Sequence, residues 1–226
     1  MRLAALGVLI AMMGAAPAQA QAQAPSPPRF TVCLQPMGPH DRWLLPVLAR
    51  GIEHVYGFAT RTLPPRDLPA AAWYPPRQRW RAEKVLDAIL ADEAARAGCD
   101  AVVGVTSDDI STTRDDAHLD WGILGLAYLD RQVCVVSSFR ARRGVARRKV
   151  AIRMVKVADH ELGHVLGMDH GGAPGCIMND ARGSVKTVDR ETGVLCPDER
   201  SHVEDKLGVA LPERGAIDWG FVIDGR

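Results

Sequence analysis

Short apolar runs alternate along this chain with longer segments whose apolar residues recur at helical spacing. The runs that predict buried strands are residues 30–34, 58–63 and 101–105. The segments that predict helices are residues 40–56, ended by Gly57, and residues 81–97, ended by Gly98. This alternation predicts an α/β (α+β) fold, in which helices pack on a mostly parallel, twisted sheet.

Two further apolar runs, residues 122–128 and 132–138, are separated only by residues 129–131. So short a connection predicts an antiparallel hairpin, and one of its strands must be an edge of the sheet. The proline-rich segment 63–76 and the polar segment 107–120 are predicted to be surface loops. Aromatic residues beside the first could bind a ligand and aspartates in the second could hold calcium, but packed and solvated loops are the simpler interpretations.

The segment 150–166 has helical spacing and contains most of the sequence HELGHVLGMDH, which runs from His160 to His170. His160 and His164 stand at i and i+4, so both imidazoles can reach one zinc ion from the same face of a helix. Gly167 can take the left-handed conformation that ends a helix, and the turn delivers His170 as a third ligand. Three histidine ligands leave the fourth position of the ion free, which is typical of a catalytic zinc.

Glu161 directly follows the first of these histidines, so its carboxylate can take a proton from a water molecule that zinc has made more acidic. This would make Glu161 the general base of a hydrolytic reaction. HExxH alone also occurs by accident in unrelated surface helices. The glycine and the third histidine, in a chain with only 7 histidines, favour a metal site over two solvated histidines.

HExxHxxGxxH is the signature of the metzincin metallopeptidases. The residues after it resemble the archaemetzincin branch, whose pattern continues HCxxxxCxM and, further on, CxxC. Here Cys176 and Met178 match the first pattern and Cys196 begins the second, whereas Gly171 and Glu199 stand where the family has cysteines. The resemblance implies that Met178 belongs to a Met-turn, an apolar floor beneath the metal, although a methionine taken alone is more often core filler.

The resemblance also implies how substrate binds. In metzincins an antiparallel edge strand lines the cleft and pairs with an extended peptide, and residues 122–127 match that strand. The candidate substrate-binding residues are therefore Gly122, Ile123, Leu124 and Gly125. The two glycines would let a peptide backbone approach closely, and an ordinary hairpin is the alternative.

We expect one metallopeptidase domain at residues 29–226, with an upper lobe at 29–167 and a smaller C-terminal lobe at 168–226 that carries the Met-turn. Residues 1–20 combine Arg2, an apolar run and Ala18-Gln19-Ala20, the pattern of a secretory signal peptide. The protein is therefore expected to be exported, either periplasmic or secreted, with a disordered lead-in at residues 21–28. No later run approaches the roughly 18 apolar residues that a membrane span needs, so no stable membrane anchor is expected.

In archaemetzincins four cysteines hold a second, structural zinc, and this chain keeps only Cys176 and Cys196 of the four. Two thiolates do not make a closed zinc site, so one catalytic zinc is expected and a second is not. Because the resemblance brings these two cysteines together in an exported protein, we predict a Cys176–Cys196 disulfide, with two reduced buried cysteines as the alternative. No bond is predicted among Cys33, Cys99 and Cys134.

The charges are balanced, 28 basic against 27 acidic, so nothing predicts a nucleic acid partner. A basic run at residues 140–149 could steer acidic substrates, or it could be a solvated loop. A last helix is predicted at residues 197–207. The sequence predicts a monomeric zinc-dependent peptidase that acts on peptides or proteins. The alternatives are an exported zinc protein that binds peptides with little turnover, which the presence of Glu161 disfavours, and a hydrolase of non-peptide amides.

Overall fold

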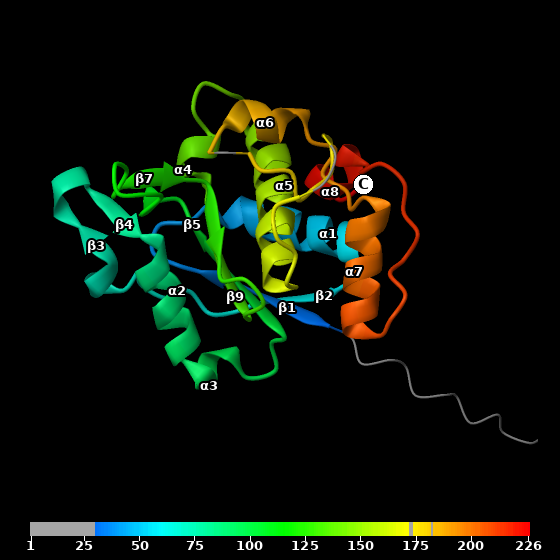
Figure 1. Cartoon of the computed structure of the whole chain (residues 1–226), viewed down its shortest axis with the longest axis horizontal. Coiled ribbons are helices and arrows are strands. Elements are labelled where there is room, and N and C mark those ends of the chain that lie inside the picture. The colour runs from blue at the N-terminus through cyan, green and yellow to red at the C-terminus, as the bar shows by residue number, and fades with distance from the viewer. Residues whose placement is uncertain (1–29, 172–173, 182) are drawn as a thin grey trace, which may run out of the picture.

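The computed structural model describes residues 30–171, 174–181 and 183–226, and it contains a five-stranded main sheet with the order β2-β1-β5-β9-β8 (Figure 1). The strands of this sheet are β2 (Ala59–Thr62), β1 (Thr31–Pro36), β5 (Ala101–Thr106), β9 (Val133–Ser137) and β8 (Gly125–Ala127). The first four run parallel, and β8 pairs antiparallel with β9 at the edge. The predicted sheet is confirmed. The predicted signal peptide and lead-in lie outside the described residues.

Helices cover both faces of the main sheet. The long helices α1 (Leu45–Tyr56) and α5 (Arg147–Val165) lie on one face, and α2 (Ala82–Ala91) lies on the other. Neighbouring residues of β5 show the division, because Val103 packs with α1 and α5 whereas Val102 packs with α2. Every residue of β5 is buried, which is why this strand appears in the sequence as a continuous apolar run.

A second, smaller sheet has the order β3-β4-β6-β7. Its strands are β3 (Trp73–Tyr74), β4 (Arg79–Arg81), β6 (Ile110–Thr112) and β7 (Trp121–Ile123). The prediction that residues 107–120 form only a polar loop was wrong, since β6 lies within them. This strand is too short to show an apolar period. Ion pairs add to apolar burial in stabilising this region, since Asp109 contacts both Arg79, at 2.8 Å, and Arg140, at 2.8 Å.

The predicted edge strand at residues 122–127 is divided at Leu124. Gly122 and Ile123 lie in β7 and pair with β6, so only residues from Gly125 onward form the edge of the main sheet. The guanidinium of Arg140 occupies the space that a Cβ on Gly122 would fill. The prediction that Gly122 lets a substrate backbone approach was wrong. This glycine makes room for an arginine side chain of the same protein.

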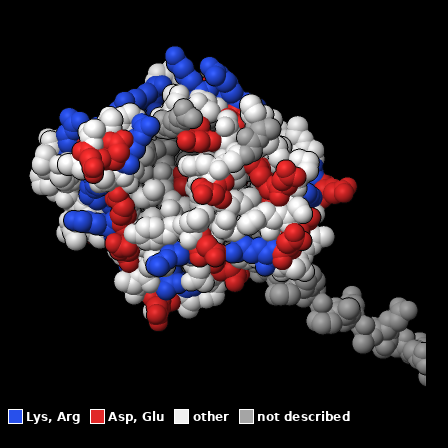
Figure 2. All heavy atoms as spheres, viewed as in Figure 1, with Lys and Arg blue, Asp and Glu red and all other residues white. Residues whose placement is uncertain are grey.

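The basic run at residues 140–149 spans the turn between two helices, and most of its charges are paired. It begins in α4 (Ser138–Ala141) and continues into α5. Arg142 contacts Asp41 at 2.6 Å and Lys149 contacts Asp189 at 3.0 Å. Lys and Arg side chains gather along the upper rim of the molecule, near α4 and α6 (Figure 2). This pairing does not favour a steering role for the run.

The C-terminal region, residues 168–226, shares the main core. Ile177, Val203 and Val222 are buried in the same cluster as α5 and one face of the sheet. The remaining helical segments are η1 (Arg42–Leu44), η2 (Ala70–Ala72), η3 (Pro75–Arg77), α3 (Glu93–Arg96), α6 (Val185–Arg190), α7 (Pro197–Leu207) and α8 (Trp219–Asp224). The last predicted helix is thus confirmed as α7. Among the described residues, no helix has the length and apolar character needed to cross a membrane.

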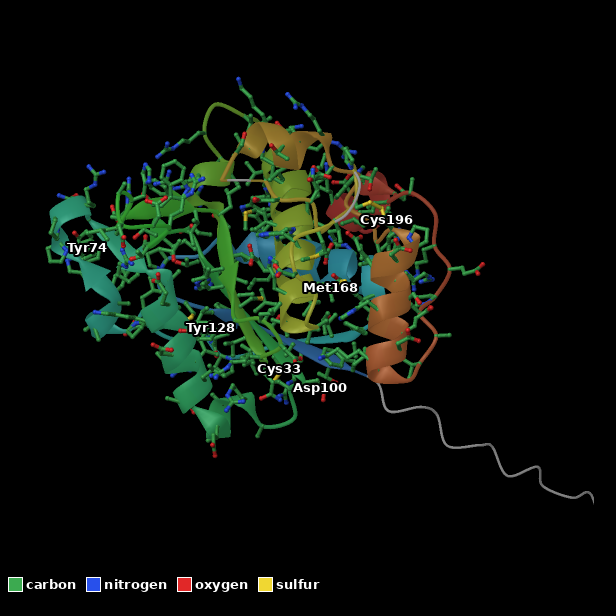
Figure 3. The ribbon with its side chains drawn as sticks, in the orientation of Figure 1. Cys33, Tyr74, Asp100, Tyr128, Met168 and Cys196 are labelled. Carbon is green, nitrogen blue, oxygen red and sulfur yellow. A yellow bond between two sulfur atoms is a disulfide. The ribbon has the colours of Figure 1, made fainter. Side chains whose placement is uncertain are left out.

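Two disulfides cross-link the chain. The predicted Cys176–Cys196 bond is present, and Figure 3 shows Cys196 at the beginning of α7. A second bond joins Cys33 in β1 to Cys99, which precedes β5, so the prediction of no bond among the other cysteines was wrong. This bond forms because β1 and β5 pair in parallel, which brings two cysteines that are 66 residues apart in the sequence close together. Cys134 is free and buried.

Candidate active site

Helix α5 carries three of the candidate residues, His160, Glu161 and His164. It lies across the main sheet, between the sheet and the C-terminal region (Figure 1), and its last turn ends at Val165. Gly167 has a φ of +86°, and its N–H donates to the carbonyl of His164 at 2.9 Å. A residue without Cβ takes this left-handed conformation without strain. The chain therefore turns back at the position expected from the sequence.

Three histidine side chains converge on one point. The Nε2 atoms of His160 and His164 each lie 3.2 Å from Nε2 of His170. Tetrahedral zinc with Zn–N bonds of about 2.0–2.1 Å holds its nitrogen ligands about 3.3–3.4 Å from one another. Both separations from His170 therefore fit one zinc ion, and all three ligand atoms lie within 4.8 Å of one another.

The other ring nitrogens fix the tautomer of two of these histidines. His160 Nδ1 donates to the carbonyl of Ile177 at 2.6 Å, and His164 Nδ1 donates to the carbonyl of Met168 at 2.7 Å. A neutral imidazole with its proton on Nδ1 presents a lone pair at Nε2. Backbone carbonyls hold metal-binding histidines in this way, which orients the ring and raises the basicity of the ligand. The donor set therefore suits a cation at the point of convergence.

Burial favours the neutral form of two of the histidines, His160 and His164. It lowers the pKa of His160 to about 4 and lowers the pKa of His164 below its usual value, with further lowering from the neighbouring histidines. Zinc binds the neutral form of histidine, so protons compete little for the site near neutral pH.

Glu161 lies beside the histidines in the same pocket. It is 7% exposed and, with Leu124 and Gly125, lines the same pocket as His160. A Cβ on Gly125 would lie 2.5 Å from Glu161 Oε1 and 2.6 Å from its Cγ. Gly125 therefore makes room for the carboxylate. Burial raises the pKa of Glu161 to about 8, and a dication held by the histidines would oppose this shift by favouring the ionised form.

Met178 packs beneath the histidines. Its side chain is 1% exposed, and its Sδ occupies the space that a Cβ on Gly163 would fill. Gly163 is the glycine inside HELGH, so the helix is narrow where the methionine contacts it. The Gly171 N–H donates to the Met178 carbonyl at 3.3 Å, which connects the chain after His170 to the Met-turn.

The pocket extends from the histidines between β8 and the segment that follows the Met-turn. Its lining includes three residues that the sequence analysis missed, Lys156, Asn179 and Glu191. Lys156 stands four residues before His160, so helical spacing alone could have placed it on this face. Its Nζ donates to the carbonyls of Val188, at 3.1 Å, and Glu191. Asn179 Nδ2 donates to Glu191 Oε1 at 2.6 Å, and no local sequence pattern indicates this pair.

A second group of metal-ligand atoms lies behind the Met-turn, formed by Cys176, Cys196 and Glu199. The two sulfur atoms are bonded to each other, and both oxygens of Glu199 accept backbone hydrogen bonds. This group therefore has other partners in the structure, whereas the Nε2 atoms of the three histidines converge on one point. Of the predicted site residues, Glu161, the histidines, Ile123, Leu124 and Gly125 line one pocket, Met178 packs against Gly163 of α5, and Gly122 lies outside the pocket lining.

Known proteins match this combination of fold and site. The model of peptidase family M54 matches residues 82–204. The archaemetzincin of Halobacterium salinarum is 31% identical over 153 residues, which cover 64% of this chain and 83% of that protein. The archaemetzincin of Methanocaldococcus jannaschii is 28% identical over 180 residues, which cover 77% of this chain and 93% of that protein.

Solved structures agree with the sequence relatives. The crystal structure of the Archaeoglobus fulgidus archaemetzincin complexed with malonate superposes with a TM-score of 0.63 at 25% identity, covering 76% of this chain and 99% of that one. The Methanopyrus kandleri archaemetzincin gives a TM-score of 0.66 at 24% identity, covering 80% and 96%, and shows the same fold. Fold and site together define a zinc metallopeptidase. The chain belongs to peptidase family M54, the archaemetzincins.

Proposed function

We propose that this protein hydrolyses peptide bonds with Glu161 as the general base and with His160, His164 and His170 as the ligands of a single catalytic zinc. The observation that carries the proposal is the convergence of three Nε2 atoms beside a buried carboxyl group in one pocket. When bound, zinc would polarise the scissile carbonyl and lower the pKa of the attacking water.

The protein's own residues transfer the protons and position the general base. Glu161 accepts a proton from the attacking water and returns it to the leaving amine, so one carboxyl group serves both proton transfers. Gly125 leaves the space in which this carboxyl group sits. The burial of Glu161 removes competing solvent from its oxygens.

An extended peptide is the proposed substrate. Strand β8 is the last strand of the main sheet, so its outer edge is not paired with another strand of the described chain. Backbone groups at such an edge can pair with a peptide, which would lie across the pocket that Leu124, Gly125 and Leu126 line. This supports peptide binding by strand addition. The edge strand that would pair with the peptide is β8, which is shorter than the predicted strand at residues 122–127.

We also propose that the protein is exported. The two disulfides support this proposal, because such bonds persist in oxidising compartments and are rare in the cytosol. The signal-like pattern at residues 1–20 is the second support.

The decisive experiment compares the wild-type protein with Glu161→Gln, which has nearly the same shape and no proton-accepting carboxylate. Both proteins should bind one zinc per chain, and only the wild type should cleave a mixed peptide library. His170→Ala is the matched control for the metal, and it should lose zinc as well as turnover. Equal cleavage by Glu161→Gln and wild type would reject the general base. Zinc binding without cleavage by the wild type would favour the peptide-binding alternative.

A further inference from the structure

One peptide group connects the candidate zinc site to helix α7. The carbonyl of Ile177 accepts the hydrogen bond from His160 Nδ1 at 2.6 Å. The N–H of the same peptide group, which belongs to Met178, donates to Glu199 Oε1 at 3.0 Å. A continuous chain of hydrogen bonds therefore runs from the imidazole of His160 through a single peptide group to a carboxylate.

Glu199 is well placed to act on this peptide group. It is 8% exposed, and its second oxygen, Oε2, accepts from the N–H of Cys196 at 2.8 Å. Both oxygens thus accept backbone N–H groups, so the carboxyl group is held from two sides. The residue lies in the first turn of α7, beside the Cys176–Cys196 disulfide.

We propose that Glu199 is a positioning residue for zinc, acting on His160 through the Ile177–Met178 peptide group. A carboxylate that accepts the N–H polarises the peptide and makes its carbonyl oxygen a stronger acceptor. The stronger acceptor holds the Nδ1 proton of His160 more firmly, which fixes the ring and raises the basicity of Nε2 toward a metal. The inference rests on the proposed role of His160 as a zinc ligand.

Capping of α7 does not explain both bonds. A capping box uses one carboxylate oxygen on the N–H of the N-cap residue, here Cys196, and that oxygen is Oε2. Oε1 is not needed for the cap and instead contacts Met178, 21 residues away in the sequence. Glu199 stands where the family pattern has a cysteine, and Cys176 and Cys196 are bonded to each other. The chain therefore has a carboxylate and a disulfide where archaemetzincins have thiolates for a structural metal.

The test compares Glu199→Gln with Asp198→Asn. The glutamine can keep the capping bond to Cys196 with its single carbonyl oxygen, but it then turns an NH₂ group toward the Met178 N–H. Asp198 is the exposed neighbour in the same helical turn, so Asp198→Asn removes the same charge without touching the Met-turn. Glu199→Asp keeps the charge, while its shorter side chain cannot serve both N–H groups, and it provides a second variant should Glu199→Gln unfold.

Three measurements separate positioning from structure. Zinc affinity, from competition with a chelator, should fall about tenfold or more in Glu199→Gln and Glu199→Asp and stay unchanged in Asp198→Asn. In the zinc-loaded protein, the NMR signal of the His160 Nδ1 proton should move upfield in Glu199→Gln, as its hydrogen bond weakens. With saturating zinc, kcat should fall while KM is unchanged.

These experiments distinguish failure of the positioning role of Glu199 from failure of the proposed zinc site. If His160→Ala binds zinc as tightly as the wild type, the metal site itself is misassigned. If His160→Ala loses zinc while Glu199→Gln and Glu199→Asp bind it like the wild type, the positioning role is rejected. An equal loss in Asp198→Asn would likewise reject it, because the effect would then come from charge near α7 and not from the peptide group.

Discussion

The region before Gly167 and the region after it are held together in different ways. The first has the main sheet with α1, α2 and α5, where strands such as β5 and β9 are buried along their whole length. The second, residues 168–226, has α6, α7 and α8 separated by irregular segments among its described residues, and polar contacts to α5 add to the apolar core that it shares. Apolar packing and the Cys33–Cys99 bond hold the first region, whereas the second also depends on particular polar side chains at its boundary with α5.

The polar contacts between the two regions are spread along α5. Arg153 donates to both oxygens of Asp189 at 2.9 and 2.8 Å, near the start of the helix. Lys156 donates to two carbonyls at the end of α6, and His160 donates to Ile177. The candidate site is assembled across this boundary, because Glu161 comes from the first region and His170 from the second. Global stability and zinc affinity should therefore respond to different substitutions.

The largest expected effect is on global stability, from removal of the Cys33–Cys99 disulfide by a Cys33→Ala and Cys99→Ala double substitution. This bond closes a loop with a sequence separation of 66, and loop entropy predicts a loss of about 4 kcal/mol in the free energy of unfolding. The bond lies in the first region, on the face of the main sheet that packs with α2 and not with α5, so zinc affinity should not change. Chemical unfolding and chelator competition measure the two quantities.

The matched double substitution, Cys176→Ala with Cys196→Ala, should show the opposite balance. Its bond has a sequence separation of 20, so the loss of stability should be smaller, about 3 kcal/mol. Because Cys176 lies two residues before Met178, zinc affinity should fall as well. Equal effects of the two double substitutions on zinc affinity would contradict the division into two regions.

Gly125→Ala should lower turnover without loss of zinc. The new methyl group would lie 2.5 Å from Glu161 Oε1, so the carboxylate must move. A displacement of about 1 Å in a reacting group can reduce the rate about 100-fold. Gly171→Ala is the control, since nothing lies within 4 Å of its Cβ position, and it should be tolerated. Steady-state kinetics with zinc analysis decides the matter, and unchanged kcat in Gly125→Ala would show that Glu161 tolerates displacement.

The sequence predicted the main sheet and long helices of the first region well because apolar periodicity determines them, whereas the short strands of the second sheet show no period. The strands of the main sheet, the long helices and the turn at Gly167 all follow from spacing that local physical rules explain. The histidine motif belongs to this region or directly follows it, so its convergence was predictable from helical spacing and one glycine. The Met-turn and the Cys176–Cys196 bond depended on the family resemblance.

Contacts between distant segments could not be predicted in the same way. Cys33–Cys99 depends on which strands are neighbours in the sheet, and a single sequence read alone does not give that order. Gly122 and Gly125 look alike in the sequence, yet one adjoins Arg140 and the other adjoins Glu161. The two hydrogen bonds of Glu199 likewise follow from tertiary packing, and its sequence context indicates only a helix cap.

Asp189→Asn tests the polar contacts between the regions through their pH dependence. Hydrogen bonding by Arg153 lowers the pKa of Asp189 to about 2, below its usual value of about 3.9. A carboxyl group with a lowered pKa stabilises the folded state at all pH values above its unfolded pKa, and this contribution disappears as the pH falls from about 4 to about 2. The wild type should therefore be more stable than Asp189→Asn by about 2 kcal/mol near neutral pH.

The difference between the two proteins should vanish near pH 2. Unfolding by denaturant at a series of pH values measures it, and Asp205→Asn, at an exposed position of α7, serves as the control. A difference that is constant between pH 7 and pH 2 would show that the ionised carboxylate is not the stabilising group.

The smallest effect is expected for Met178→Leu, which tests whether the floor of the site needs a thioether or only an apolar side chain. Leucine has a similar volume, so the swap should reduce the free energy of unfolding by about 1 kcal/mol. The substitution leaves the backbone of residue 178, which contacts Glu199 and Gly171, unchanged. Zinc affinity should therefore stay within a factor of about two. Removal of an outer partner of a metal ligand typically costs at least about tenfold. Gly163→Ala approaches the same contact from the helix and should be more disruptive, because its methyl group would occupy the place of the Met178 Sδ. Denaturant unfolding and zinc titration of both variants test this order. A severe loss of zinc in Met178→Leu would mean that the sulfur atom, and not the backbone around it, maintains the geometry of the three histidines.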